Sequence, residues 1–333
     1  MIEILETPPL NSVQDLGRLG FRCFGLMQSG AMDRLALAAA NAMLGNDLDA
    51  AGIEVQLFPL TLRFNADGMI AVTGADCRPR LDGWELPPWW ATPVSAGQTL
   101  TLSPPRSGMR SYLAVSGGLD VPMVLGSRST QLREGFGGLD GRSLQAGDRL
   151  RNLDAARAVP RDAVGFGVAP SMEALPLSPP GASAATEVAL RVIPAGEYED
   201  FDAASQDIFW NTGWTVTAQS NRQGYRLQGV PLRRRREVEM RSHGIVPGVV
   251  QVPPSGQPIL QLADGNSAGG YPKIGVIIDA DLWRVAQAAP GRVLRFLRCT
   301  PAEAKHASRE LSDYLSLVGN QARYLLRHRE RAG

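Results

Sequence analysis

Glycine and proline interrupt this chain too often for it to fold as a bundle of long helices. Its 333 residues include 36 glycines and 24 prolines, and both residue types weaken or end helices. Between them lie short runs rich in β-branched and aromatic residues, a composition typical of strands. These runs are Met69–Thr73, Thr99–Leu102, Tyr112–Val115, Val188–Ile193, Val249–Val252 and Ile274–Ile278. The sequence therefore predicts a mainly β fold with few helices.

Three segments share a turn glycine followed by alternating apolar residues. They begin at Gly97, Gly147 and Gly291. Alternation places every second side chain on the same face of a strand. Strands of this kind suit the closure of small β-barrels.

Two segments carry helical signals. The first spans about residues 32–44 and ends before Gly45, with Leu35, Ala38 and Ala39 among the apolar residues of one face. The second begins with Thr300-Pro301-Ala302-Glu303, which combines a capping-box pair with proline at the first helical position. Apolar residues at helical spacing follow it. We expect this C-terminal helix over 300–331.

A stretch rich in alanine, proline and glycine divides the chain. A length of 333 residues, at about 100–200 residues per domain, indicates two domains. The expected organisation is an N-terminal lobe at 1–154, a linker at 155–187, a C-terminal lobe at 188–299 and the helix at 300–331.

Charge and the N-terminus argue against two classes of partner. With 34 basic and 33 acidic side chains, the chain has no overall field to attract nucleic acid or an anionic membrane. The basic run Arg233–Arg236 lies between apolar residues, which favours a solvated hairpin turn over a nucleic-acid site. The first residues lack the features of a signal peptide, and no stretch reaches 18 apolar residues. We therefore expect a soluble, cytoplasmic protein with neither nucleic acid nor membrane as partner.

The sequence offers no pattern for a metal or a nucleotide. The cysteines and histidines stand far apart, at Cys23, Cys77, Cys299, His243, His306 and His328. This spacing gives no support for a zinc site or for disulfides. The only two lysines, Lys273 and Lys305, do not follow the glycines of a Walker A motif, and Gly135–Gly141 misses the last glycine of a dinucleotide fingerprint.

The segment Gly265-Asn-Ser267-Ala-Gly269 matches the serine-hydrolase pattern G-x-S-x-G. A nucleophile elbow must open a helix, but this chain continues with Gly270-Tyr271-Pro272 and β-branched residues. We therefore expect a glycine-rich loop, whose backbone N–H groups can approach an anion.

Other polar residues are candidates for binding or catalysis. Lys273 lies at a loop-to-strand junction and can hold a carboxylate or phosphate, or simply be a surface lysine. Ser220, Asn221 and Arg222 can bind a carboxylate, or they can have a structural role in barrel closure. His243 is the only histidine outside the C-terminal helix, so it is either the candidate general base or a loop residue.

Motifs across nearly the whole chain resemble one family. They are Val13–Phe21, Ser29–Asp33, Ala40–Asn46, Tyr112–Gly118, Leu125–Thr130, Leu190–Pro194, Gln219–Leu227, Val250–Pro258 and Gly269–Gly275. In this order they resemble the biotin-dependent carboxyltransferase-like family of allophanate hydrolase subunit 2, also called KipA. That family includes the C subunit of the prokaryotic ATP-dependent 5-oxoprolinase.

The resemblance implies two cyclophilin-like β-barrel lobes, in agreement with the predicted strands. It implies a component of 5-oxoprolinase that opens 5-oxoproline to L-glutamate with ATP. The implied partners are the KipI-like B subunit of that enzyme and its A subunit, a lactam hydrolase. Because the chain has no nucleotide fingerprint, we expect ATP at a site shared with a partner. The alternatives are the carboxyltransferase half of a biotin-dependent urea carboxylase-type system, with biotin as cofactor, and a non-enzymatic KipA-like regulator of a KipI-like protein.

The candidate residues form one predicted site, in which the chain departs from the family's pattern at two places. The expected catalytic residues are His243 and Lys273, and the expected substrate-binding residues are Ser220, Asn221, Arg222, Gln251, Gly269, Gly270 and Tyr271. In this expectation Arg222 and Lys273 hold the substrate carboxylate, and the glycine N–H groups stabilise charge on the opening carbonyl. Asn221 replaces the family's usual aspartate, and Gly265–Ala268 replaces a segment that usually carries a basic residue.

Overall fold

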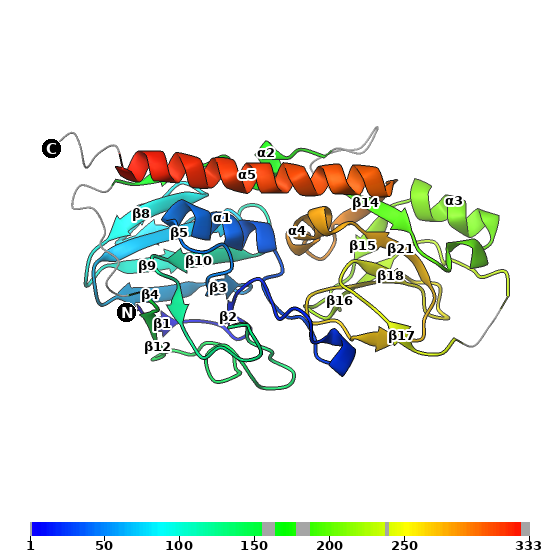
Figure 1. Ribbon diagram of the computed structural model, residues 1–333, viewed down its shortest axis with the longest axis horizontal. Helices are drawn as coiled ribbons and strands as arrows, with labels where there is room; N and C mark the ends of the chain where they lie inside the picture. The colour runs from blue at the N-terminus through cyan, green and yellow to red at the C-terminus, as the bar shows by residue number, and fades with distance from the viewer. Residues whose placement is uncertain (1, 155–163, 178–186, 237–239, 328–333) are drawn as a thin grey trace. The chain divides into compact units, whose positions relative to one another are not determined.

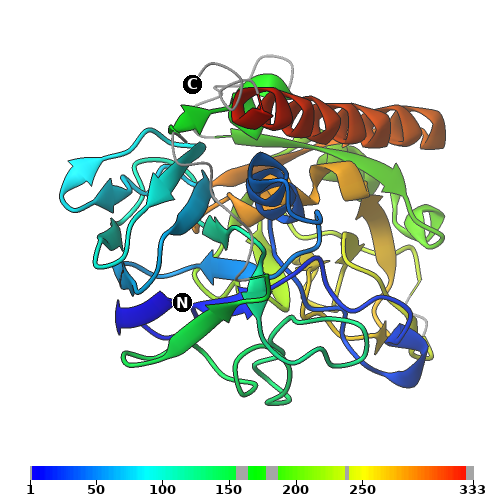
Figure 2. The ribbon, with the colours of Figure 1, turned by 60° about the vertical axis from the view of Figure 1, so that its left-hand side comes forward.

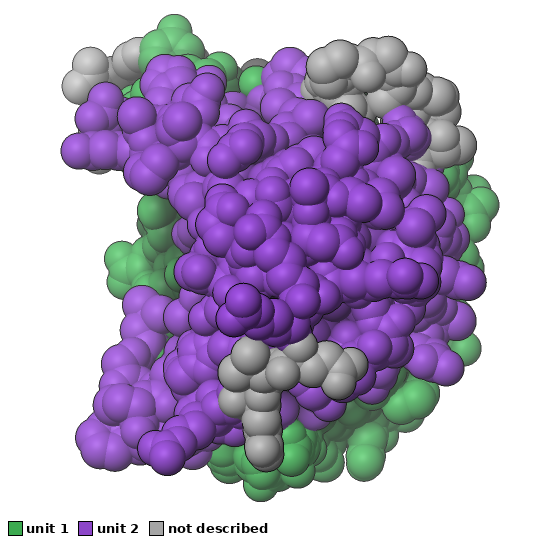
Figure 3. All heavy atoms as spheres, turned by 90° about the vertical axis from the view of Figure 1, so that its right-hand side faces the viewer, with its two compact units in different colours: residues 1–18, 29–174, 312–333 green, residues 19–28, 175–311 purple. Residues whose placement is uncertain are grey.

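The computed structural model describes residues 2–154, 164–177, 187–236 and 240–327. Figure 3 colours its two compact units separately: unit 1 comprises residues 1–18, 29–174 and 312–333, and unit 2 comprises residues 19–28 and 175–311. The expected linker at 155–187 lies outside the described residues except for Glu187, the first residue of β14 (Glu187–Pro194), and for 164–177. That part carries β13 (Phe166–Gly167) and α2 (Ser171–Ala174). The domain bounds given above stay a prediction.

Unit 1 is built on two antiparallel sheets. The seven-stranded sheet has the order β11 (Leu119–Asp120), β12 (Arg149–Asn152), β1 (Ile2–Glu6), β4 (Leu60–Phe64), β9 (Thr99–Leu102), β6 (Arg80–Leu81), β7 (Trp84–Glu85). The six-stranded sheet has the order β13, β8 (Trp90–Val94), β5 (Gly68–Gly74), β10 (Ser111–Val115), β3 (Gly52–Val55), β2 (Ser12–Gln14).

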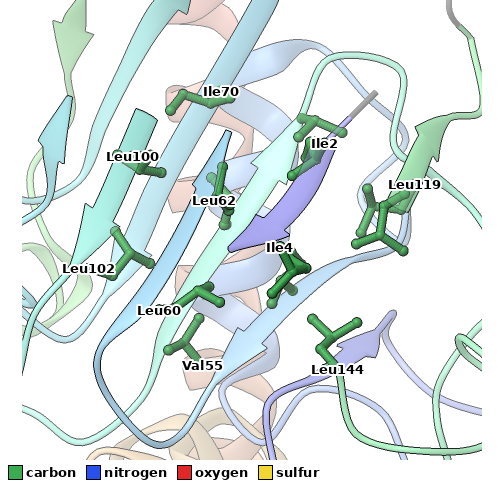
Figure 4. Packing of buried hydrophobic residues seen from close by; sticks show 14 of the residues in the cluster. Ile2, Ile4, Val55, Leu60, Leu62, Ile70, Leu100, Leu102, Leu119 and Leu144 are labelled. Atoms are coloured by element: carbon green, nitrogen blue, oxygen red, sulfur yellow. The ribbon is translucent and has the colours of Figure 1, made fainter. Parts of the chain in front are cut away.

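Both sheets contribute to one apolar core in unit 1. Leu100 and Leu102 of β9 are fully buried, whereas the threonines beside them are half-buried. This is the alternation predicted for the strand after Gly97. Figure 4 shows these leucines together with Val55 and Ile70 of the other sheet. The core of unit 1 therefore lies between its two sheets.

Helix α1 (Arg34–Leu44) is enclosed rather than amphipathic. The Asp33 carboxylate accepts a hydrogen bond from the Ala36 N–H at 2.8 Å, so the helix begins after the N-cap and not at residue 32. Gly45 ends it in the left-handed region with φ of 64°. Every residue from Leu35 to Leu44 is buried. The predicted burial of Leu35, Ala38 and Ala39 is confirmed, but the burial extends around the whole helix, because small alanines let β5 and β10 pack closely against it.

Unit 2 contains a closed barrel. Its strand order is β14 (Glu187–Pro194), β21 (Lys273–Ile277), β18 (Val249–Gln251), β19 (Ile259–Gln261), β16 (Gly224–Gln228), β15 (Trp214–Val216), β22 (Val293–Arg298). The parallel pairing of β14 with β22 closes the ring. The predicted mainly β fold is confirmed, and each of the six predicted strand runs overlaps an observed strand.

Short elements surround this barrel (Figure 1). They are η1 (Arg22–Phe24), η2 (Tyr198–Asp200), α3 (Ala203–Asn211), η3 (Asp279–Asp281), α4 (Leu282–Ala286) and a separate ribbon of β17 (His243–Gly244) with β20 (Ala268–Gly269). Aromatic rings pack α3 against the barrel: Phe209 of α3 and Phe296 of β22 are buried, and their ring centroids lie 4.9 Å apart. Figures 1 and 2 show α5 (Pro301–Arg327) as one continuous helix, which begins in unit 2 and ends in unit 1.

The basic run Arg233–Arg236 is largely exposed, as predicted for a solvated turn, but two of its side chains also make contacts within unit 2. Arg234 forms an ion pair with Asp200 at 3.3 Å, and the Arg235 Nε–H donates to the Phe201 carbonyl at 3.1 Å. Only Arg233, Arg235 and Arg236 are exposed. Part of the run is therefore tied to η2 and the residue after it.

The predicted capping box at the start of α5 is confirmed. The Thr300 N–H donates to a Glu303 carboxylate oxygen at 2.7 Å, and the Glu303 N–H donates to the Thr300 hydroxyl at 3.3 Å. The hydrogen bond from the Thr300 backbone holds the pKa of Glu303 below its ordinary value of 4.5.

This capping box predicts a pH-dependent stability. Because the folded-state pKa of Glu303 is lowered, its contribution is present above the ordinary value of 4.5 and is lost as pH falls through the folded value. We expect Glu303→Gln to lower the melting temperature more at neutral pH than at about pH 3, where more of the Glu303 carboxyl group is protonated. Thermal melting at both pH values measures this. An equal difference at both would contradict it.

Candidate functional site

The β17–β20 ribbon brings two predicted site residues together. His243 of β17 pairs in register with Gly269 of β20, and the Ile245 N–H donates to the Ser267 carbonyl at 2.9 Å. After Ser267 the chain enters a strand and not a helix. The prediction of a glycine-rich loop is confirmed, and a nucleophile elbow is excluded here.

Gln251 links the ribbon to the barrel. It is buried at the end of β18, and its amide nitrogen donates to the Tyr271 carbonyl at 3.2 Å. Its amide oxygen accepts a hydrogen bond from Gln261 at 3.0 Å. A Cβ placed on Gly269 would lie 3.0 Å from the Gln251 amide nitrogen. The Tyr271 side chain itself is exposed.

Glu197, between β14 and η2, joins the two predicted catalytic residues. One carboxylate oxygen accepts a hydrogen bond from the Lys273 backbone N–H at 3.1 Å. The other oxygen lies 3.5 Å from the His243 Nε2. Sequence reasoning missed both Glu197 and Gln261, because neither lies in a recognisable motif and each meets its partners only through the barrel fold.

Lys273 opens β21 and is half-buried. It stands opposite Gln251 of β18 in the barrel register. Within the described parts of the chain, its ammonium group forms neither a hydrogen bond nor an ion pair. The side chain therefore keeps its charge available for a ligand.

Ser220 and Asn221 shape the turn before β16. The Asn221 side-chain oxygen accepts hydrogen bonds from the backbone N–H groups of Gln223 at 2.8 Å and Gly224 at 3.3 Å. The Ser220 hydroxyl oxygen accepts one from the Arg226 N–H at 3.1 Å. An aspartate at position 221 could accept the same two bonds. The departure from the family pattern therefore preserves this turn.

Arg222 already binds a carboxylate of its own chain. Its guanidinium donates to both Asp264 side-chain oxygens, from Nε at 2.8 Å and from Nη2 at 3.2 Å. Both side chains are buried, each 7% exposed. The Asp264 N–H donates back to the Arg222 carbonyl at 3.0 Å. These contacts favour the structural role that the sequence left open for Arg222.

The η1 segment is attached to the ribbon through Arg22. The Arg22 guanidinium donates to the Ile245 carbonyl at 2.6 Å and to the Asn266 carbonyl at 2.8 Å. Burial lowers the pKa of Arg22. One arginine thus fixes the residues that follow β17 and precede β20.

The structure therefore sorts the predicted residues into two groups. Linked contacts join His243, Gln251, Gly269, Tyr271 and Lys273, with Glu197 and Gln261 added. The second group consists of Ser220, Asn221 and Arg222. The first two stabilise the turn before β16, and Arg222 forms an internal ion pair. The first group offers an ammonium, amides and glycine backbone, which suit a small polar ligand with a carboxylate.

Neither a candidate metal site nor a membrane-spanning helix occurs among the described residues. Among the residues that the structure describes, no three His, Cys, Asp or Glu side chains gather into a possible metal site. Across the same residues, no helix combines the length and apolar character needed to cross a bilayer.

A protein-family comparison matches most of the chain. The family described as "Carboxyltransferase domain, subdomain A and B" matches residues 24–298. The chain belongs to this carboxyltransferase domain family. The predicted family resemblance is confirmed.

Named relatives of this carboxyltransferase-family chain fall into two groups. It is 45% identical to the C subunit of 5-oxoprolinase from Escherichia coli K12, over 94% of this chain and 96% of the relative. The Haemophilus influenzae protein of the same name is 41% identical over 96% and 97%. Urea amidolyase of Saccharomyces cerevisiae is 32% identical over 97% of this chain, which spans only 18% of that protein. The crystal structure of the Kluyveromyces lactis urea amidolyase superposes with a TM-score of 0.84 at 28% identity, covering 94% and 20% of the two chains.

Gly269 in this carboxyltransferase-family site predicts a local packing effect. A Cβ there would lie 2.6 Å from Ile245 Cδ1, as well as close to Gln251, so Gly269→Ala must displace one of these side chains. We expect a loss of no more than about 1 kcal/mol in stability, because the atoms that must move are the far ends of flexible side chains. Gly244→Ala, at the facing ribbon strand with nothing within 4 Å of its Cβ, is the matched control. Urea unfolding of both variants measures the difference, and equal losses would contradict this packing.

Proposed function

We propose that this carboxyltransferase-family chain is the C subunit of an ATP-dependent 5-oxoprolinase, which opens 5-oxoproline to L-glutamate together with its A and B subunits. The observation that carries the proposal is the 45% identity to the C subunit of the Escherichia coli 5-oxoprolinase. That match covers 94% of this chain and 96% of the relative. The urea amidolyase match covers only 18% of its relative.

The proposed site suits the chemistry of this substrate. 5-Oxoproline carries a carboxylate beside a cyclic amide, and the Lys273 ammonium supplies a charge for the carboxylate. The Gly269-Gly270 segment, at the end of β20, supplies backbone toward the amide carbonyl, where negative charge develops as the ring opens. Gln251 holds the chain just after this segment through the Tyr271 carbonyl at 3.2 Å. Arg222 is left out of this arrangement, because its guanidinium pairs with Asp264.

The proposed role predicts where ATP binds. The chain lacks the sequence fingerprints of nucleotide sites, so we place ATP at a site shared with a partner protein. We expect the chain to co-purify with a KipI-like partner, the B subunit of the proposed enzyme. The isolated chain should show little ATP binding by calorimetry. Tight ATP binding by this chain alone would contradict the division of labour.

The second candidate is the carboxyltransferase half of a biotin-dependent system. The superposition on urea amidolyase, with a TM-score of 0.84, favours it. Avidin, which sequesters biotin, separates the two candidates. Under the first proposal, avidin leaves glutamate release from 5-oxoproline by the assembled subunits unchanged. Activity that needs bicarbonate and is abolished by avidin would establish the second candidate instead.

A further inference from the structure

The His243 ring is oriented by a backbone carbonyl. Its Nδ1 lies 3.0 Å from the Arg241 carbonyl oxygen, which can only accept a hydrogen bond. The ring therefore carries a proton on Nδ1. This assignment fixes what the opposite nitrogen can be: a neutral imidazole would present the bare lone pair of Nε2, and an imidazolium would present an N–H.

The opposite nitrogen faces a carboxylate. Nε2 is buried, without a hydrogen-bond partner in the described structure, and it lies 3.5 Å from a Glu197 side-chain oxygen. A bare lone pair there would lie 3.5 Å from a carboxylate oxygen, too close for a bridging water, and the two electron-rich atoms would repel each other. A proton on Nε2 turns the same contact into an ion pair.

We propose that Glu197 holds His243 as an imidazolium and that this internal pairing leaves the Lys273 ammonium as the cation that binds the substrate carboxylate. The proton lies on the imidazole because an imidazole is more basic than a carboxylate. His243 is then a positioning residue and not a general base. The identity of the carboxylate rests on the proposed function.

The pairing of His243 with Glu197 determines whether the Lys273 ammonium is drawn to Glu197 or stays available for a ligand. The Lys273 backbone N–H donates a hydrogen bond to Glu197, so the flexible Lys273 side chain is close enough to turn towards that carboxylate. While His243 carries a charge, the Glu197 charge is offset. Once His243 loses its proton, Glu197 competes for Lys273. In the described structure, the other polar contacts of these two side chains are with backbone groups: the Lys273 N–H on Glu197 and the Arg241 carbonyl on His243.

Nitrogen NMR of the full chain tests the first half of this inference. With ¹⁵N-histidine at neutral pH, two protonated ring nitrogens give similar shifts, whereas a neutral ring gives two widely separated ones. We expect the imidazolium pattern for His243, assigned with His243→Gln, and the neutral pattern in Glu197→Gln. Glu199→Gln, two residues away and exposed, is the control that leaves the ring unchanged. A neutral His243 in the wild-type chain overturns the inference, and so does an imidazolium in folded Glu197→Gln.

The second half of the inference, that the Lys273 ammonium binds the substrate carboxylate, can be tested by NMR of the lysine side chains. The chain has only two lysines, Lys273 and Lys305. Reductive ¹³C-methylation keeps their charge and gives each lysine its own signal. We add 5-oxoproline, acetate or 2-pyrrolidinone, a lactam without a carboxylate, to the labelled chain mixed with its unlabelled partners. The inference expects both carboxylates to shift the Lys273 signal, while Lys305 stays unchanged and 2-pyrrolidinone shifts neither. The inference also expects the affinity of the chain for either carboxylate to fall roughly threefold once His243 loses its proton. In the Glu197→Gln chain this affinity should not change with the protonation of His243.

These outcomes separate the inference from the proposed function. If the assembled subunits open 5-oxoproline while no carboxylate moves the Lys273 signal, the inference is overturned and the function stands. If acetate moves the Lys273 signal and 5-oxoproline is neither bound nor opened, the inference is supported and the proposed substrate is wrong.

Discussion

Replacing Arg222 with alanine will destabilise unit 2 by about 3–5 kcal/mol. The substitution leaves the Asp264 carboxylate buried with its guanidinium partner removed, at a position where both side chains are 7% exposed. A buried charge without its partner costs far more than an exposed ion pair contributes. The pair also ties the turn before β16 to the chain that leaves β19. Urea unfolding followed by tryptophan fluorescence measures the loss.

Two variants give this prediction its controls. Arg233→Ala removes an exposed arginine of the same unit and should leave stability within about 0.5 kcal/mol of the wild-type chain. Asp264→Asn should also destabilise, because it removes the charge from the other side of the pair. An Arg222→Ala chain that unfolds like the wild type but binds 5-oxoproline weakly would reinstate Arg222 as a substrate ligand.

Replacing Lys273 with alanine will reduce turnover of 5-oxoproline by the assembled subunits about ten- to hundredfold. This corresponds to one charge-assisted contact of roughly 1.5–3 kcal/mol. The free energy of unfolding should not change, because the Lys273 ammonium has no hydrogen-bond or ion-pair partner within the described structure. The measurement is kcat/KM for glutamate release, with thermal melting of the same preparation.

The matched control for this prediction is Lys305→Ala, which removes the other lysine from the exposed surface of α5 and should change neither quantity. A Lys273→Ala chain that melts several degrees lower would show that the lysine is structural. Unchanged turnover would remove it from the site.

Local patterns explain why much of the fold could be predicted from the sequence. The strand after Gly97 and the capping box of Thr300 with Glu303 each involve neighbours a few residues apart, so their signals are continuous in the chain. The enclosure of α1 could not be predicted in the same way. Its alanines form an apolar face in any helix, and only the packing of β5 and β10 decides that the whole circumference is buried.

In the candidate site, too, the features set by neighbours in sequence were predictable and those set by distant segments were not. The glycine-rich loop after Gly265 was predictable, because proline and β-branched residues exclude a helix there. The partners of Arg222 and His243 were not, because Asp264 and Glu197 lie 42 and 46 residues away from them in sequence. A basic residue in a loop suits an external carboxylate and an internal one equally well. Only the folded barrel shows that the Arg222 side chain pairs with the internal carboxylate of Asp264. The Lys273 ammonium pairs with no carboxylate in the described structure.

Glutamate release from 5-oxoproline, measured with each component left out in turn, tests the proposed function most directly. We expect glutamate and phosphate to appear together only when ATP, this chain, its lactam-hydrolase partner and its KipI-like partner are all present. Omission of this chain should abolish the reaction, and adding back the Lys273→Ala chain should restore only a small part of it. Full glutamate release without this chain, or none with the correct partners and ATP present, would contradict the account.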